Sequence, residues 1–160
     1  MPSKAMPDPG HAEVAVGAVV QRGDEILLIR RGRGAAVGQW AIPGGRVEFG
    51  ERLKAAVARE VREETGLEVR DLHVTRIFNN AYAEPGGKRY PFYFVQFVAR
   101  AANTRLAPDD HEVREARWFD DLPPDMAFRD DYAEDFRSWR GSGKFDESPG
   151  KSTSTHNPFR

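Results

Sequence analysis

The segment GRVEFGERLKAAVAREVREETGL, residues 45–67, carries the pattern that decides the fold. Between Glu51 and Thr65 it contains neither glycine nor proline, which predicts a helix over these residues. Gly50 stands where an N-cap residue belongs. Gly66 stands where a left-handed residue commonly ends a helix. The sequence therefore predicts one well-delimited helix in the middle of the chain.

Three glutamates, Glu60, Glu63 and Glu64, crowd the last turns of this helix. Like charges three or four residues apart repel by about 0.2–0.5 kcal/mol per pair, and anions at a helix C-terminus cost about 0.3–1 kcal/mol each. At 100° per residue, the three acids share an arc of roughly 100° with the apolar residues of the helix, so they are predicted to face inward or into a cleft. Burying several ionised carboxylates close together is expensive unless a cation offsets their charge, and hard oxygen ligands suit Mg²⁺ or Mn²⁺. The alternative is an exposed helix on which Arg59 and Arg62 pair with these acids.

Composition places the chain among globular proteins of one domain. It has 160 residues, 39% hydrophobic and 31% charged, a net charge of −1 and no cysteine. No apolar run approaches the roughly 20 residues of a membrane span, and the start MPSKAMPDPG has no signal-peptide core. We expect a cytoplasmic protein without disulfides, with no membrane and no polynucleotide partner.

The order of the expected elements indicates an α+β fold. The domain is expected to span residues 12–140, between an N-terminal arm at 1–11 and a low-complexity C-terminal tail at 141–160. A mid-chain helix among more numerous strands is typical of a mixed α+β or α/β/α sandwich. Alternation and β-prone runs predict strands at residues 13–21, 25–30, 40–45, 67–78, 89–100 and 115–120, and amphipathic spacing predicts a second helix at 130–140. The strand at 40–45 is expected to end in a break at Pro43, Gly44 and Gly45.

The spacing within residues 45–67 resembles the Nudix box, G-x5-E-x7-R-E-U-x-E-E-x-G-U, where U is a bulky aliphatic residue. Gly45, five residues, Glu51, seven residues and then REVREETGL occupy every specified position. The flanking segments WAIPGG and ARWFDDLPP resemble the usual entry and exit of the family, so the resemblance covers about residues 12–124. It implies the Nudix fold, a mixed sheet between helices with the box as a loop–helix–loop.

The resemblance also implies an activity and a metal site. Nudix hydrolases cleave nucleoside diphosphates linked to another moiety, with Mg²⁺ or Mn²⁺. By position, the metal ligands are expected to be three glutamates and one backbone carbonyl, and Glu51 and Arg59 are expected to orient them. The expected ligands are Gly45, Glu60, Glu63 and Glu64.

The residue that activates water is left open among three candidates. Glu60 is one by analogy with MutT-type members, whereas other members take the base from a later loop, where this chain has His111 and Glu112. A carboxylate whose pKa is raised by like-charged neighbours would suit this role. An exposed charged loop is the plainer interpretation of His111 and Glu112.

Candidate substrate contacts lie outside the box. Arg31 and Arg33 are expected to meet phosphates through charge-assisted hydrogen bonds, and Phe78 and Tyr82 to stack on a base. The plainer interpretations are a solvated basic loop and core aromatic residues.

The flanking sequence favours a nucleoside triphosphate, cleaved to a nucleoside monophosphate and pyrophosphate. The alternative is ADP-ribose or a nucleotide sugar. A non-catalytic nucleotide sensor is a third hypothesis, but its expected mark, loss of a box glutamate, is absent from this chain. Dimers are common in the family, so the resemblance also implies a homodimer.

Overall fold

The computed structural model describes residues 12–33, 37–83, 89–103, 105–108 and 111–142. The expected N-terminal arm and the tail beyond residue 142 lie outside the described residues. Along the described chain the elements are β1 (Glu13–Arg22), β2 (Glu25–Arg31), β3 (Trp40–Ala41), β4 (Gly44–Arg46), α1 (Leu53–Thr65), β5 (Val69–Ala83), β6 (Arg89–Ala101), β7 (Val113–Phe119) and α2 (Arg129–Ser142).

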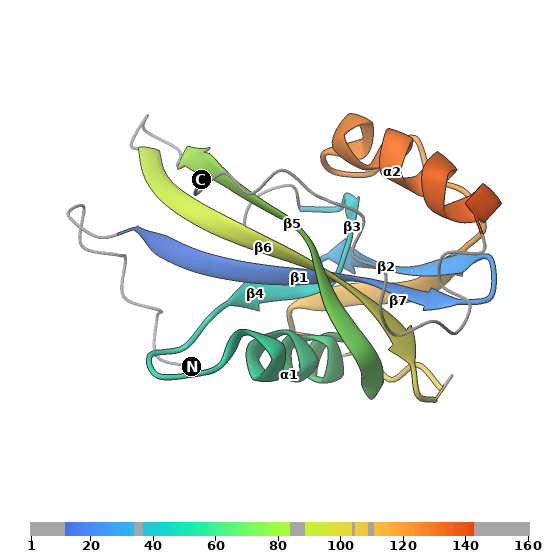
Figure 1. Cartoon of the computed structure of the whole chain (residues 1–160), viewed down its shortest axis with the longest axis horizontal. Coiled ribbons are helices and arrows are strands. Elements are labelled where there is room, and N and C mark those ends of the chain that lie inside the picture. Colours follow the sequence, from blue (N-terminus) through green and yellow to red (C-terminus); the bar gives the residue numbers. More distant parts are fainter. Residues whose placement is uncertain (1–11, 34–36, 84–88, 104, 109–110, 143–160) are drawn as a thin grey trace.

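These strands form one mixed sheet, which confirms the expected mixed α+β architecture. The main order is β3-β2-β1-β6-β5, with β4 also paired to β1 and β7 to β2. The β1–β6 pair is parallel, and the other named pairs are antiparallel. Figure 1 shows α1 and α2 on opposite sides of this sheet. Within the described residues, no helix is long and apolar enough to cross a membrane.

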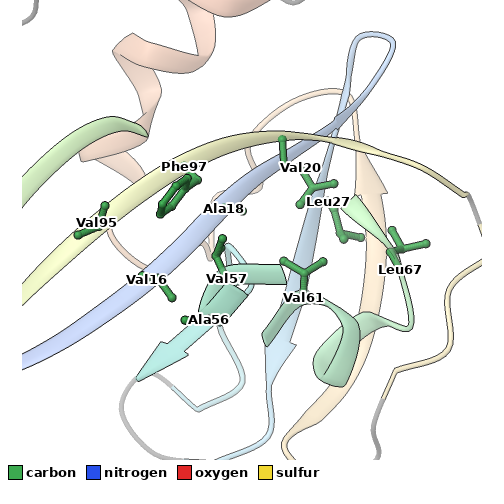
Figure 2. Packing of buried hydrophobic residues seen from close by; sticks show 11 residues of the cluster. Val16, Ala18, Val20, Leu27, Ala56, Val57, Val61, Leu67, Val95 and Phe97 are labelled. Atoms are coloured by element: carbon green, nitrogen blue, oxygen red, sulfur yellow. The ribbon is translucent and has the colours of Figure 1, made fainter. Parts of the chain in front are cut away.

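Each helix covers its own hydrophobic cluster. Beneath α1, Ala56, Val57 and Val61 pack against apolar side chains of β1 and β6 (Figure 2). On the other face, Tyr132 and Phe136 of α2 pack with residues of β1, β2 and β3. Because helices cover both faces of the sheet, every residue of β1 from 16 to 21 is buried. The continuous apolar run in that strand reflects burial on both faces.

Helix α1 begins two residues later than expected. Arg52 is its N-cap, with extended backbone and no side-chain cap, so the prediction of Gly50 as N-cap is wrong. Gly50 has φ +76°, a left-handed conformation that does not fit an N-cap residue. Gly66 ends the helix with φ +76° and donates its N–H to the Arg62 carbonyl at 2.9 Å, as predicted.

The expected strand at residues 40–45 is two strands that pair with different neighbours. β3 pairs with β2, and β4 pairs with β1. Gly44 and Gly45 were expected to break the strand, but they form most of β4. A Cβ on Gly44 would lie 2.2 Å from the Val16 carbonyl oxygen, so only glycine allows β4 to approach β1 this closely.

Candidate active site

Two glutamates of α1 lie against the two glycines of β4. The Gly44 N–H donates to Oε1 of Glu64 at 2.8 Å. A Cβ on Gly45 would lie 2.5 Å from the carboxyl carbon of Glu60. Both glutamates are buried, with only 5% and 6% exposure. Glycine at both positions therefore creates the space in which the two carboxylates reach the sheet.

Glu64 sits where a negative charge is strongly disfavoured. Burial is the main reason that its pKa is raised to about 8, and the nearby charges of Glu60 and Glu112 act in the same direction. The Gly44 hydrogen bond and the charge of Arg31 lower its pKa but do not offset the burial. The cluster thus holds more potential negative charge than its protein surroundings neutralise.

Arg59 is the cation that lies within this cluster. Its Nε and Nη2 atoms bind the two carboxylate oxygens of Glu51 at 2.7 and 2.9 Å, a bidentate pair. Its Nη1 atom donates to Glu60 at 3.0 Å and to Glu63 at 3.3 Å, and Nη2 also reaches the Arg46 carbonyl at 3.1 Å. One guanidinium therefore links the loop before α1 to two of the three clustered acids.

The bidentate pair also shifts the pKa values of both partners. Hydrogen bonds from Arg59 lower the pKa of Glu51 to about 2, and the bonds to Glu51 raise the pKa of Arg59 above its usual range. Glu51 is therefore ionised at any pH near neutral. Glu51 and Arg59 therefore hold each other in place beside the clustered acids.

The third acid of the motif is placed differently from the other two. The Glu63 side chain is 54% exposed, so the expected inward direction holds for Glu60 and Glu64 but not for Glu63. Arg62 pairs with Glu68 at 3.7 Å, away from the cluster. The exposed-helix alternative is thus correct only for the contact between Arg59 and Glu63.

The residues fit a hard divalent cation by their chemistry. Carboxylate oxygens of Glu60, Glu63 and Glu64 and the backbone of Gly45 are the donor types that Mg²⁺ and Mn²⁺ accept. Within the described part of the chain, no three acidic or histidine side chains are gathered closely enough to hold an ion in this arrangement. Arg59 lies between Glu60 and Glu63 instead. Glu63 is the exposed member of the three acids, and its contact with Arg59 lies at the surface.

The two candidate loops meet at the edge of the cluster. The Gly32 N–H donates to the Glu112 carbonyl at 2.9 Å, and the Arg33 guanidinium donates to the Glu112 carboxylate. Arg31 and Glu112 both lie near enough to influence Glu64. His111 is exposed beside them. The structure thus brings together Arg31, Arg33 and Glu112, the residues predicted from two separate loops.

The two aromatic residues predicted to stack on a base, Phe78 and Tyr82, both lie on β5. The Phe78 ring stacks on Phe94 with centroids 5.2 Å apart and lies under the Arg76 guanidinium. Phe94 packs against the cluster beneath α2, so this stack is on the sheet face opposite α1. The backbone of Tyr82 pairs with Tyr90 in the β5–β6 ladder, and its side chain lies outside the described residues.

An open hollow of about 810 Å³ lies at the start of α2. Its lining contains none of the residues predicted for the site. The residues that line it are Pro124, Met126, Phe128, Arg129, Asp130 and Asp131.

Sequence reasoning missed two parts of the site. The role of the Gly44 N–H was missed, although the doubled glycine after Pro43 was a local signal of close backbone approach. The ion pair between Arg33 and Glu112 was also missed, since 79 positions separate the two residues and no local pattern connects them.

Comparisons with known proteins find relatives of this chain in both sequence and fold. The NUDIX domain model matches residues 11–137. A crystal structure of a MutT NUDIX hydrolase from Burkholderia pseudomallei superposes with a TM-score of 0.67 at 26% identity, covering 78% of this chain and 97% of that one. An ADP-ribose pyrophosphatase from Methanocaldococcus jannaschii is 33% identical over 132 residues, 81% of this chain and 76% of its own length.

Two further relatives carry other names. The NAD-capped RNA hydrolase NudC of Pseudomonas aeruginosa is 36% identical over 111 residues, which is 66% of this chain but only 36% of that protein. The putative 8-oxo-dGTP diphosphatase 2 of Mycobacterium tuberculosis is 44% identical over 63 residues, 39% of this chain and 45% of its own length. The present chain thus spans less than half the length of these two relatives.

Proposed function

The chain belongs to the Nudix family, and on that premise we propose that it is a Mg²⁺- or Mn²⁺-dependent enzyme that hydrolyses the diphosphate linkage of a nucleoside diphosphate derivative. The observation that carries this proposal is the pair of buried carboxylates, Glu60 and Glu64, packed against Gly44 and Gly45. Buried carboxylates whose charge the protein leaves partly uncompensated are what a divalent cation would stabilise.

The residues of the site fall into two groups, those that would bind the metal and those that orient the metal-binding side chains. Glu60, Glu63, Glu64 and the Gly45 backbone would hold the metal, which when bound neutralises phosphate charge and activates water. Glu51 has a supporting part, since its bidentate pair fixes the Arg59 guanidinium beside Glu60 and Glu63.

The candidates for the catalytic base differ in their surroundings. Glu60 is buried and contacts Arg59. Glu112 is more exposed and belongs to a loop that reaches the cluster from outside. We favour Glu112, because it lies beside the cluster without being one of the expected ligands. His111 is exposed beside Glu112 and is the next candidate.

Two substrate classes follow, and different observations favour them. The relative named ADP-ribose pyrophosphatase aligns with 81% of this chain, which favours an internal diphosphate bridging a nucleoside to a second group. The flanking sequence, together with the shorter match to a relative named 8-oxo-dGTP diphosphatase, favours a nucleoside triphosphate. Arg31 and Arg33 would contact the phosphates in either case.

A substrate panel with product identification tests the function. ADP-ribose, nucleotide sugars, dinucleoside polyphosphates and nucleoside triphosphates, both normal and oxidised, are compared by kcat/KM with Mg²⁺ present. We expect a nucleoside monophosphate as one product. Release of inorganic pyrophosphate indicates a triphosphate substrate, whereas release of a sugar phosphate indicates an internal diphosphate. Binding of these compounds without turnover would contradict the enzymatic proposal and favour a sensor.

A homodimer and a cytoplasmic location are also proposed from the sequence resemblance and composition. Light scattering after gel filtration would measure the mass of the particle in solution. A mass of about 18 kDa, the mass of one chain, would contradict the dimer.

A further inference from the structure

The end of β2 is paired with the start of β7, and the residue after β2 is hydrogen-bonded to the residue before β7, next to the glutamate cluster. The ladder between the strands shifts register after Arg30 and continues to a pairing of Arg31 with Val113. One residue further on, the Gly32 N–H binds the Glu112 carbonyl at 2.9 Å. A Cβ at position 32 would lie 3.0 Å from that oxygen. These backbone contacts fix the position of Glu112 without involving its side chain.

The Glu112 carboxylate is held separately, by the Arg33 guanidinium. The pair is exposed, with 58% of the Arg33 side chain and 37% of the Glu112 side chain accessible. Such a pair between exposed charges changes an equilibrium by about fivefold at most. The contact is therefore weak enough for a stronger anion to replace the carboxylate.

A phosphate is such an anion. A guanidinium binds phosphate through parallel charge-assisted hydrogen bonds, and a phosphate group carries more negative charge than a carboxylate. Arg33 is thus able to exchange a carboxylate partner for a phosphate partner. The backbone bond from Gly32 to Glu112 is unaffected by this exchange.

We propose that Arg33 is a positioning residue: it holds the Glu112 carboxylate in an ion pair until a phosphate of the substrate takes over its guanidinium and releases Glu112 toward the glutamate cluster. This inference rests on the proposed diphosphate substrate. It makes the Glu112 carboxylate available at the site only after the substrate binds. It also explains why a residue predicted to contact phosphate and a residue predicted to serve as base are paired with each other.

Pyrophosphate binding to the metal-free full-length protein tests the exchange. Calorimetry in EDTA compares four proteins: wild type, Glu112→Gln, Arg33→Ala and the double variant. We expect Glu112→Gln to tighten pyrophosphate binding by about threefold to fivefold, because it removes the competitor for Arg33. In the Arg33→Ala background the same substitution should have almost no effect. Glu25→Gln, which breaks the pair of a similarly exposed glutamate with Arg22, measures the general effect of removing one negative charge.

Several results would overturn the proposal. Equal tightening by Glu112→Gln with and without Arg33 would show only long-range electrostatics, and no tightening would show that the two groups do not compete. Failure of wild-type protein to bind millimolar pyrophosphate would also refute it. Because these measurements need no turnover, they are independent of the substrate panel. An inactive enzyme that passes the binding test would refute the proposed function and not the exchange.

Steady-state kinetics with the best substrate add a second readout. Arg33→Ala is expected to raise KM about tenfold and to change kcat less than threefold, since Glu112 is already released in that variant. Arg33→Lys keeps the positive charge but loses the paired N–H donors of the guanidinium, so its KM should lie between those of the wild type and Arg33→Ala. Glu112→Gln is expected to lower kcat. If Arg33→Ala lowers kcat as much as Glu112→Gln does, Arg33 does not act by releasing Glu112.

Discussion

The substitution Glu64→Gln should raise the free energy of unfolding of the metal-free protein. It should also remove most of the decrease in that free energy that the wild-type protein shows as the pH rises. The pKa of Glu64 is raised from 4.5 to about 8 in the folded protein, so the folded state binds a proton more tightly than the unfolded state. The free energy of unfolding is then highest below pH 4.5 and falls as the pH rises through 8. Glutamine keeps an oxygen acceptor for the Gly44 N–H but carries no charge.

The size of the effect follows from the shift. A change from 4.5 to about 8, at about 1.4 kcal/mol per unit, corresponds to about 5 kcal/mol over the whole window and about 3 kcal/mol at pH 7. A typical domain has only about 5–15 kcal/mol of net stability. One carboxyl group would thus remove a large part of the stability of the metal-free protein.

Urea unfolding followed by tryptophan fluorescence, in EDTA at several pH values between 5 and 8, measures the difference. Trp40 is buried in the core beneath α2 and reports on its loss. We expect the wild-type free energy of unfolding to decrease by about 1.4 kcal/mol per pH unit relative to the variant. All other groups are the same in both proteins, so their contributions cancel in the comparison. Saturating Mg²⁺ should restore the stability of the wild-type protein and have a smaller effect on Glu64→Gln.

A matched control is Glu68→Gln, which removes an exposed carboxylate near the same helix. Its pH dependence should match that of the wild type. An identical slope in wild type and Glu64→Gln would refute the reasoning, since it would mean that Glu64 does not bind the extra proton in the folded state.

Three further outcomes are expected. Glu63→Gln should lower turnover with Mg²⁺ by about 100-fold or more without lowering the melting temperature. The control, Glu68→Gln, should leave turnover within twofold of the wild type. Near-wild-type rates for Glu63→Gln would contradict its assignment as a metal ligand. Gly45→Ala should reduce Mg²⁺ affinity and activity, because the new Cβ would lie 2.5 Å from the Glu60 carboxyl group. Unchanged Mg²⁺ binding, measured by calorimetry, would contradict that packing argument. EDTA should abolish hydrolysis and added Mg²⁺ or Mn²⁺ should restore it; product formation that survives thorough chelation would defeat the metal-dependent mechanism.

Local sequence was a good guide to the central helix and to most strands. The absence of glycine and proline predicts α1, and Gly66 ends it as expected because a left-handed residue terminates the helix. The shared arc of the acids and the apolar residues correctly predicts that Glu60 and Glu64 are buried. These predictions succeed because helix periodicity and backbone conformation depend on neighbours within a few residues.

Local sequence was a poor guide wherever the answer depended on a distant strand. Gly44 and Gly45 were expected to break a strand, but β1 pairs with them because they lack a Cβ. No local pattern indicated that Phe78 would stack on Phe94, on the sheet face opposite α1. Which face a strand residue occupies depends on register, and register is set by pairing across the sheet.

The sequence by itself determined the family, the reaction class it implies and the helix that carries the three glutamates, since the motif and the helical period are both local. Only the tertiary structure decided how that charge is balanced. It places Arg59 between Glu51 and two of the acids, exposes Glu63 while burying Glu64, and pairs Arg33 with Glu112 across 79 positions. The physical reason is that the energy of a charge depends on its burial and on the charges within a few ångströms. Those quantities exist only once the strands and the helix have been brought together.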